Sequence, residues 1–270
     1  MTQSKTISVD GCRAHYLDLG RGEPVILLHG IPGDFRTWRF SIDVLASRYR
    51  VLALDLPGWG RSEMPRRFAY SLPGLAQHVH LFQAALDLEP ASLVGLGLGG
   101  LVALETALRF PARTARVVVS GAPILSNDPP LRLHPPAGFL GRQWFKLGAK
   151  GAVRRLLARG YLDQNNLADG LVDAYARSLR RGRTLHGIAL GNPAIRARWP
   201  ELRRELAGLA VPTLAVWGEK DAVTPPENAR FLADTAPKGA LRLLRHAGHY
   251  CHEEAPAGFN SAVMDFLKEP

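Results

Sequence analysis

The sequence predicts an α/β fold, in which a mostly parallel, twisted sheet is flanked by helices and a helical cap is inserted between two strands. Short continuous apolar runs, typical of strands covered on both faces, alternate along the chain with segments of helical periodicity. One long segment, residues 122–209, shows only helical spacing and interrupts this alternation. We therefore expect a core formed by residues 1–121 and 210–270 and a cap formed by residues 122–209.

Each expected strand is a short segment with strand-like apolar patterning. The first two alternate as half-buried strands do and flank a turn at Asp10-Gly11, whereas the later ones are continuous apolar runs. In chain order, these segments are 6–9, 14–19, 24–28, 51–54, 91–96, 117–119, 213–217 and 241–244. Helical patterns cover residues 72–88, 101–109, 226–235 and 257–267. Ligands of such sheets bind beyond the carboxyl ends of the strands, so the residues that follow the runs are the candidate site.

Composition narrows the protein class. The chain has 270 residues, of which 46% are apolar and 21% charged, as in a globular protein with a large core. Its two cysteines cannot form a disulfide framework, and no leader or membrane-spanning run is evident, so we expect a cytoplasmic protein.

The net charge is +10, but the basic residues are scattered, and no nucleic-acid signature accompanies them. We expect a small-molecule substrate and neither a nucleic-acid nor a membrane partner; the oligomeric state does not follow from the sequence.

A glycine-dense turn follows the apolar run 91–96, and a helical pattern leaves it at Leu101. A strand, a sharp turn and a helix are the setting of a nucleophile elbow, whose pattern is G-x-S-x-G. Gly95 and Gly99 occupy the two flanking positions, but the middle position is Gly97. The sequence therefore predicts the turn without the nucleophilic side chain.

An aspartate and a histidine are the other two candidate catalytic residues. Asp221 follows one predicted strand, and His249 follows the next. We expect Asp221 to accept the Nδ1 proton of His249 and to stabilise its imidazolium form. His249 would then act as a general base or acid through Nε2.

Four motifs in this order resemble those of the α/β-hydrolase superfamily, in its esterase, epoxide-hydrolase and C–C-hydrolase branch. They are His29-Gly30-Ile31-Pro32-Gly33, Asp55-Leu56-Pro57-Gly58-Trp59-Gly60-Arg61-Ser62, Trp217-Gly218-Glu219-Lys220-Asp221 and Gly248-His249 with Glu254-Ala255-Pro256. The resemblance covers nearly the whole chain except the cap. It implies the elbow–acid–histidine order and an oxyanion hole formed by the backbone amides of Ile31 and Leu98. The sequence departs from the family pattern at Gly97, the position where the family has its nucleophilic side chain.

Three functions are compatible with this departure. The first is an enzyme in which a His–Asp general base and an oxyanion hole act on a small apolar or aromatic carbonyl substrate without a covalent nucleophile. Such an enzyme would be a lyase, cyclase, decarboxylase or water-adding hydrolase. The second is a serine hydrolase (esterase, lactonase or C–C hydrolase) whose serine was replaced by Gly97. The third is a non-catalytic ligand-binding protein on the same scaffold. We expect the first.

Further residues are possible parts of the pocket: His29, Asp34, Trp144 and Tyr161. For His29 we favour a role in organising the backbone of its loop, and Asp34 is at least as well suited to capping a turn or helix. The two aromatic residues suit an apolar substrate but also suit core packing.

No cofactor or metal ion is expected. His246 and His252 lack a spaced ligand set, and Ser120 and Cys251 are interpreted as structural rather than nucleophilic. The glycines of the elbow also match G-x-G-x-x-G, the pattern of dinucleotide-binding turns. No acid stands where a ribose would need one, however, so we expect no nucleotide.

Overall fold

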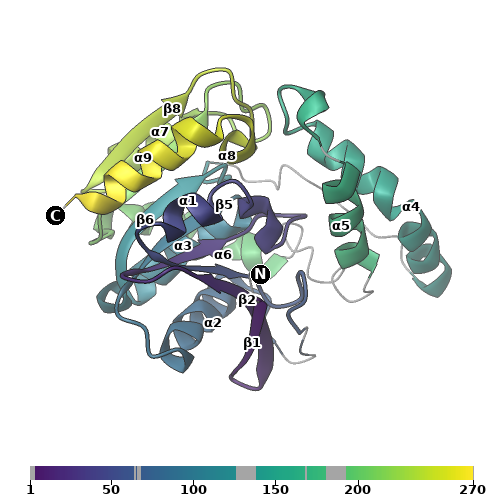
Figure 1. The fold of residues 1–270 in the computed structure, drawn as a ribbon, viewed down its shortest axis with the longest axis horizontal. Helices are drawn as coiled ribbons and strands as arrows, with labels where there is room; N and C mark the ends of the chain where they lie inside the picture. Colours follow the sequence, from purple (N-terminus) through teal and green to yellow (C-terminus); the bar gives the residue numbers. More distant parts are fainter. Residues whose placement is uncertain are drawn as a thin grey trace.

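The structure is a computed structural model that describes residues 4–63, 65, 68–125, 138–167, 169–180 and 193–269. An eight-stranded sheet with the order β1-β2-β4-β3-β5-β6-β7-β8 forms its centre (Figure 1). β1 and β2 run antiparallel to their neighbours, and β3 to β8 pair in parallel. The strands are β1 Ser4–Val9, β2 Cys12–Leu19, β3 Pro24–Leu28, β4 Arg50–Leu54, β5 Ala91–Leu96, β6 Thr114–Ser120, β7 Thr213–Gly218 and β8 Gly239–Leu244.

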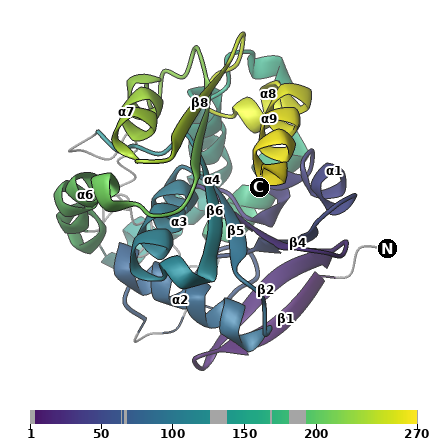
Figure 2. The same ribbon diagram turned by 90° about the vertical axis from the view of Figure 1, so that its left-hand side faces the viewer.

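Helices cover both faces of the sheet (Figure 2). On one face lie α1 (Ile42–Ala46) and α9 (Pro256–Lys268), and on the other lie α2 (Leu72–Ala85), α3 (Leu98–Arg109) and α7 (Glu227–Thr235). A short helix, α8 (Cys251–Glu254), precedes α9. The expected mostly parallel sheet flanked by helices is therefore confirmed.

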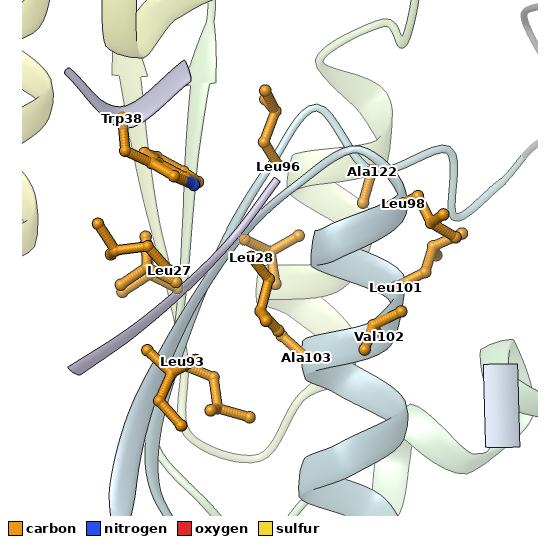
Figure 3. Close-up of a cluster of buried hydrophobic side chains, with 14 of the residues drawn as sticks. Leu27, Leu28, Trp38, Leu93, Leu96, Leu98, Leu101, Val102, Ala103 and Ala122 are labelled. Carbon is orange, nitrogen blue, oxygen red and sulfur yellow. The ribbon is translucent and has the colours of Figure 1, made fainter. Parts of the chain in front are cut away.

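The core lies between the sheet and these helices. The strands β3 to β5 are buried almost throughout, because each has helices on both sides. Figure 3 shows Leu28 of β3 and Leu96 of β5 on one side of α3, where Ala103 lies, and Leu101 and Val102 on the other side of this helix. Trp38, in the 3-10 helix η1 (Phe35–Trp38), packs on the opposite side of these strands and is fully buried. This packing fixes the strand–turn–helix unit around residue 97.

The expected cap segment contains three α-helices in its described part: α4 (Gly138–Ala158), α5 (Asp169–Arg180) and α6 (Pro193–Glu205). α4 and α5 contact each other and stand apart from the other helices (Figure 1). α6 instead contacts α2, and its Arg198 pairs with the buried Glu105 of α3, with Nε 3.0 Å from Oε2. α6 thus packs on the helices of the core, and the cap boundaries at residues 122 and 209 stay a proposal.

Most sequence-predicted elements lie within two or three residues of the observed ones. The short helices that were not predicted include α1, α8 and η1. Each is only four or five residues long, too short for an apolar period to reveal. Among the described residues, no helix combines the length and the apolarity needed to cross a membrane.

Candidate active site

The turn between β5 and α3 has the geometry of an elbow. Gly97 lies at its apex with φ 56° and ψ −114°, a backbone conformation that side-chain-bearing residues rarely adopt. Close approach requires a glycine at position 99, where a Cβ atom would stand 2.1 Å from the carbonyl oxygen of Leu28. At Gly97, by contrast, a Cβ atom would meet nothing nearer than Gly30 Cα at 3.7 Å and Gly121 O at 3.8 Å. The apex therefore has space for a side chain that the sequence does not supply.

The loops after β7 and β8 bring Asp221 and His249 together. His249 Nδ1 lies 2.9 Å from Asp221 Oδ2, and both side chains are at least nine-tenths buried. The hydroxyl of Thr224 donates to the same carboxylate oxygen at 2.8 Å and lies 3.1 Å from His249 Nδ1. Oδ1 accepts the backbone N–H groups of Val223 and Thr224, each at 2.9 Å. The carboxylate thus accepts four hydrogen bonds, which fix its position, and it orients the imidazole.

Electrostatics keep Asp221 ionised. Burial by itself raises the pKa of this carboxyl, but the neighbouring charge of His249 and the hydrogen bonds from His249 and Thr224 outweigh it. The pKa of Asp221 consequently lies below its ordinary value. The permanent negative charge of Asp221 lies next to His249 Nδ1 and favours the tautomer that carries its proton on Nδ1. Nε2 is then free to accept a proton.

A small cavity lies above the elbow. Gly97, Ile31, Leu98, His249 and Tyr250 are among the residues that line it, and its volume is about 20 Å³. A cavity of this size has room for about one water molecule where polar groups such as His249 hydrogen-bond to it. Leu98 is the first residue of α3, so its N–H has no partner within the helix and lies at the positive end of the helix dipole. The cavity therefore combines a histidine with a backbone donor suited to an oxyanion.

Two of the possible pocket residues are engaged by their own loop. His29 Nδ1 donates to Gly30 O at 2.9 Å, and its Nε2 accepts the N–H of Leu56 at 3.0 Å. Asp34 caps η1, where its carboxylate accepts the backbone N–H of Arg36 and pairs with that residue's guanidinium. Neither lies among the described residues that line the cavity. The structure therefore does not bring their side chains to the cavity.

Tyr161 lies beside the site. Its ring stacks on Tyr250 at 4.7 Å between centroids, and Tyr250 in turn contacts the His249 ring edge-on at 5.1 Å. Trp144 falls in α4, but its side chain lies outside the described residues.

Sequence reasoning missed Thr224 and Tyr250. A local signal for Thr224 was present in the stretch Asp221-Ala222-Val223-Thr224, because an aspartate commonly accepts backbone N–H groups two and three residues later. No comparable signal marked Tyr250, whose ring position depends on packing against Tyr161, which follows α4.

Other reactive side chains are held away from the cavity. Cys251 is fully buried and hydrogen-bonded to Ser120 at 3.3 Å, and burial raises the pKa of its thiol to about 12. His252 Nε2 lies 2.9 Å from the Thr37 hydroxyl, and burial lowers the pKa of this histidine to about 4. Within the described ranges, no cluster of three or more histidine, cysteine or acidic residues could hold a metal ion.

Comparisons with known proteins identify the family to which the fold belongs. The sequence model of the alpha/beta hydrolase fold family matches residues 23–256. The chain is 33% identical to 2-hydroxymuconate semialdehyde hydrolase of Pseudomonas sp. (strain CF600), over 98% of this chain and 94% of the relative. It is 30% identical to the pimeloyl-[acyl-carrier protein] methyl ester esterase of Aeromonas hydrophila, over 92% and 96% of the two chains.

A similar solved structure is a meta-cleavage product hydrolase from Pseudomonas fluorescens IP01. It has a TM-score of 0.79, an identity of 28%, and coverage of 97% of each chain. The match of the family model over most of the chain, together with these relatives, establishes that the chain belongs to the α/β-hydrolase family and is an enzyme of that family.

Proposed function

We propose that this enzyme adds water to a small carbonyl compound without forming a covalent intermediate. The observation that carries the proposal is the cavity above Gly97, which has room for about one water and is lined by His249, itself paired with Asp221. Where relatives with a serine elbow place a hydroxyl, this chain has space for a water molecule. His249 is positioned to activate that water as a general base.

The proposed reaction has two steps. His249 Nε2 takes a proton from the water while the hydroxide oxygen bonds to the carbonyl carbon and the carbonyl electron pair moves to oxygen. The backbone N–H groups of Ile31 and Leu98 stabilise the resulting oxyanion. The oxyanion then reforms its double bond, the bond to the leaving carbon or oxygen breaks, and the imidazolium of His249 returns the proton to the leaving group. Asp221 stabilises the imidazolium between the two steps.

The substrate is proposed from the lining and from the relatives. Ile31, Leu96 and Val223 are apolar residues of the lining around the water site, and such a wall suits the approach of an apolar or conjugated substrate. Relatives are named for 2-hydroxymuconate semialdehyde and for 2-hydroxy-6-oxo-2,4-heptadienoate, both small carbonyl compounds. We propose hydrolysis of a carbon–carbon bond in such a compound. Because Cys12 and Cys251 are both free thiols, we further propose that the enzyme acts in the cytoplasm.

A second candidate is a serine-type hydrolase whose nucleophile is missing from this chain. The space at Gly97, with no heavy atom within 3.7 Å of a would-be Cβ, favours it. In that case Gly97 protein binds its substrate but does not hydrolyse it.

The two candidates differ in what the Gly97 protein does. We expect it to turn over 2-hydroxymuconate semialdehyde in isotopically labelled water, with one labelled oxygen in the acid product. Mass spectrometry of the intact protein during turnover should show no adduct. Binding without turnover would contradict the water-adding enzyme and would favour the serine-type candidate or a non-catalytic binding protein.

A further inference from the structure

The histidine loop (residues 246–254) contacts a short segment of the cap directly. This segment, the cap loop (residues 160–163), follows α4. The backbone N–H of His249 donates to the carbonyl oxygen of Gly160 at 2.8 Å. A cap residue therefore provides a hydrogen bond to the main chain of the histidine itself.

One carboxylate joins the two loops. Glu254 Oε2 accepts the N–H of Gly248 at 2.8 Å, next to the histidine. Oε1 of the same carboxylate accepts the N–H groups of Leu162 at 2.6 Å and Asp163 at 3.4 Å, both in the cap loop. These bonds join a charged acceptor to backbone donors and are therefore stronger than neutral ones.

Side chains add a second connection. The hydroxyl of Tyr161 donates to Glu253, which also pairs with Arg39 Nη2 at 2.8 Å. The Tyr161 ring stacks on Tyr250, whose ring contacts His249. The spacing is tight, because a Cβ atom at Gly160 would stand 2.5 Å from Tyr250 Cε2 and 3.3 Å from His249 Cβ.

We propose that Glu254 is a positioning residue for His249, because it fixes the cap loop against the histidine loop and so sets where the imidazole stands relative to Asp221 and the cavity. The kinetic part of this inference rests on the proposed function, whereas the geometric part does not. Reacting groups must be placed closely, and a displacement of about 1 Å can cost about 10²-fold in rate. The Glu254 carboxylate makes no hydrogen bond to Asp221, and Glu254 is not among the described residues that line the cavity; its backbone N–H donates to the carbonyl oxygen of Tyr250 at 2.9 Å.

The first test is Glu254→Gln. An amide of nearly the same shape has only one oxygen, so one of the two loops must lose its acceptor. We expect kcat to fall by roughly 10-fold to 10²-fold with little change in KM. We also expect the downfield proton resonance of His249 Nδ1–H, the signature of its bond to Asp221, to broaden or disappear. Glu89→Gln, at an exposed residue between α2 and β5, is the matched control and should leave both readouts unchanged.

The second test disturbs the same contact from the cap side and does not alter Glu254. Gly160→Ala adds a methyl group against Tyr250 and His249 and should produce the same loss of kcat and of the resonance. Gly170→Ala in α5, where a Cβ meets nothing within 4 Å, is the control. Because both changes act on one contact, the double variant should lose less than the product of the two single losses.

The proposal would be overturned by folded variants whose kcat and whose Nδ1–H resonance intensity both lie within about twofold of the parent. A twofold change in rate corresponds to less than about 0.5 kcal/mol of activation free energy. A lower melting temperature with both readouts unchanged would overturn it as well, because Glu254 would then serve stability alone. If the parent shows no His249-dependent turnover, the proposed function fails, but the resonance still decides the positioning role. Its loss in both variants supports that role, and its retention overturns it.

Discussion

The Nδ1 atom of His249 lies 2.9 Å from the Oδ2 atom of Asp221, although the two residues follow different strands of the sheet. The pair is buried, and the carboxylate has a lowered pKa because His249 and Thr224 outweigh the effect of burial. This relationship is the part of the site on which both the proposed chemistry and the first prediction depend.

Asp221→Asn should lower kcat by about 10⁴-fold, the size seen when the corresponding acid of a serine protease is changed to asparagine. The asparagine amide can accept or donate toward Nδ1, so the tautomer with a free Nε2 is no longer favoured. Steady-state kinetics with a circular-dichroism check of folding would measure the effect. A loss of less than about tenfold, or 1.4 kcal/mol, would argue against a base oriented by Asp221.

Gly97→Ser should create an ester-hydrolysing elbow. The added Cβ has room, and the hydroxyl would occupy the cavity next to His249. With a chromogenic acyl ester we expect a burst of one equivalent of product, followed by slower turnover. Gly97→Ala carries the same Cβ without the hydroxyl and should show no burst. Both variants should lose about 1–3 kcal/mol of unfolding free energy, because φ is 56° at this position.

Two buried histidines should make the protein less stable in mild acid. Burial lowers the pKa of His78 and of His252 to about 4, below the value of about 6.5 in an unfolded chain. Between these values the unfolded chain binds protons that the folded chain does not, so stability is full above pH 6.5 and is lost as the pH falls toward 4.

His78→Phe tests this at a site remote from the catalytic pair, where the ring packs edge-on against Phe68. Urea unfolding at pH 7 and pH 5 should show a stability difference smaller by about 2 kcal/mol in the variant than in the parent. An unchanged difference would mean that His78 does not titrate as a buried group.

Gly99→Ala should destabilise the fold by at least about 2 kcal/mol, because its Cβ would overlap the main chain of Leu28. Gly148→Ala in α4 is the matched control, since nothing lies within 4 Å of its Cβ. There, alanine should stabilise the helix by up to about 1 kcal/mol. Thermal unfolding measures both, and equal effects would contradict the close strand–helix approach at the elbow.

Sequence reasoning could predict the sheet because its signals are local. The runs that became β3, β4 and β5 are almost wholly apolar, and the residues after β5, β7 and β8 reach the same edge of a parallel sheet. The proximity of Asp221 and His249 follows from that topology rather than from any pairing visible in the chain.

Long-range side-chain contacts could not be predicted. Tyr161 and Glu253 are 92 residues apart, and Arg198 and Glu105 are 93 apart. Such pairs depend on how helices pack and on rotamers, for which the sequence has no periodic signal. The same reason explains why Tyr250 was recognised only in the structure. It also explains why the contact of Glu254 with Leu162 was not predicted, although Glu254 belongs to the predicted histidine motif.

The central claim is that His249 activates water in a site without a nucleophile, and the most direct measurement is turnover of 2-hydroxymuconate semialdehyde by the parent and by His249→Ala. The account predicts hydrolysis by the parent and a loss of at least about 10²-fold in kcat in the variant, the low end of what a general base contributes. Equal turnover by both proteins, or a covalent adduct detected on the parent by mass spectrometry, would contradict it.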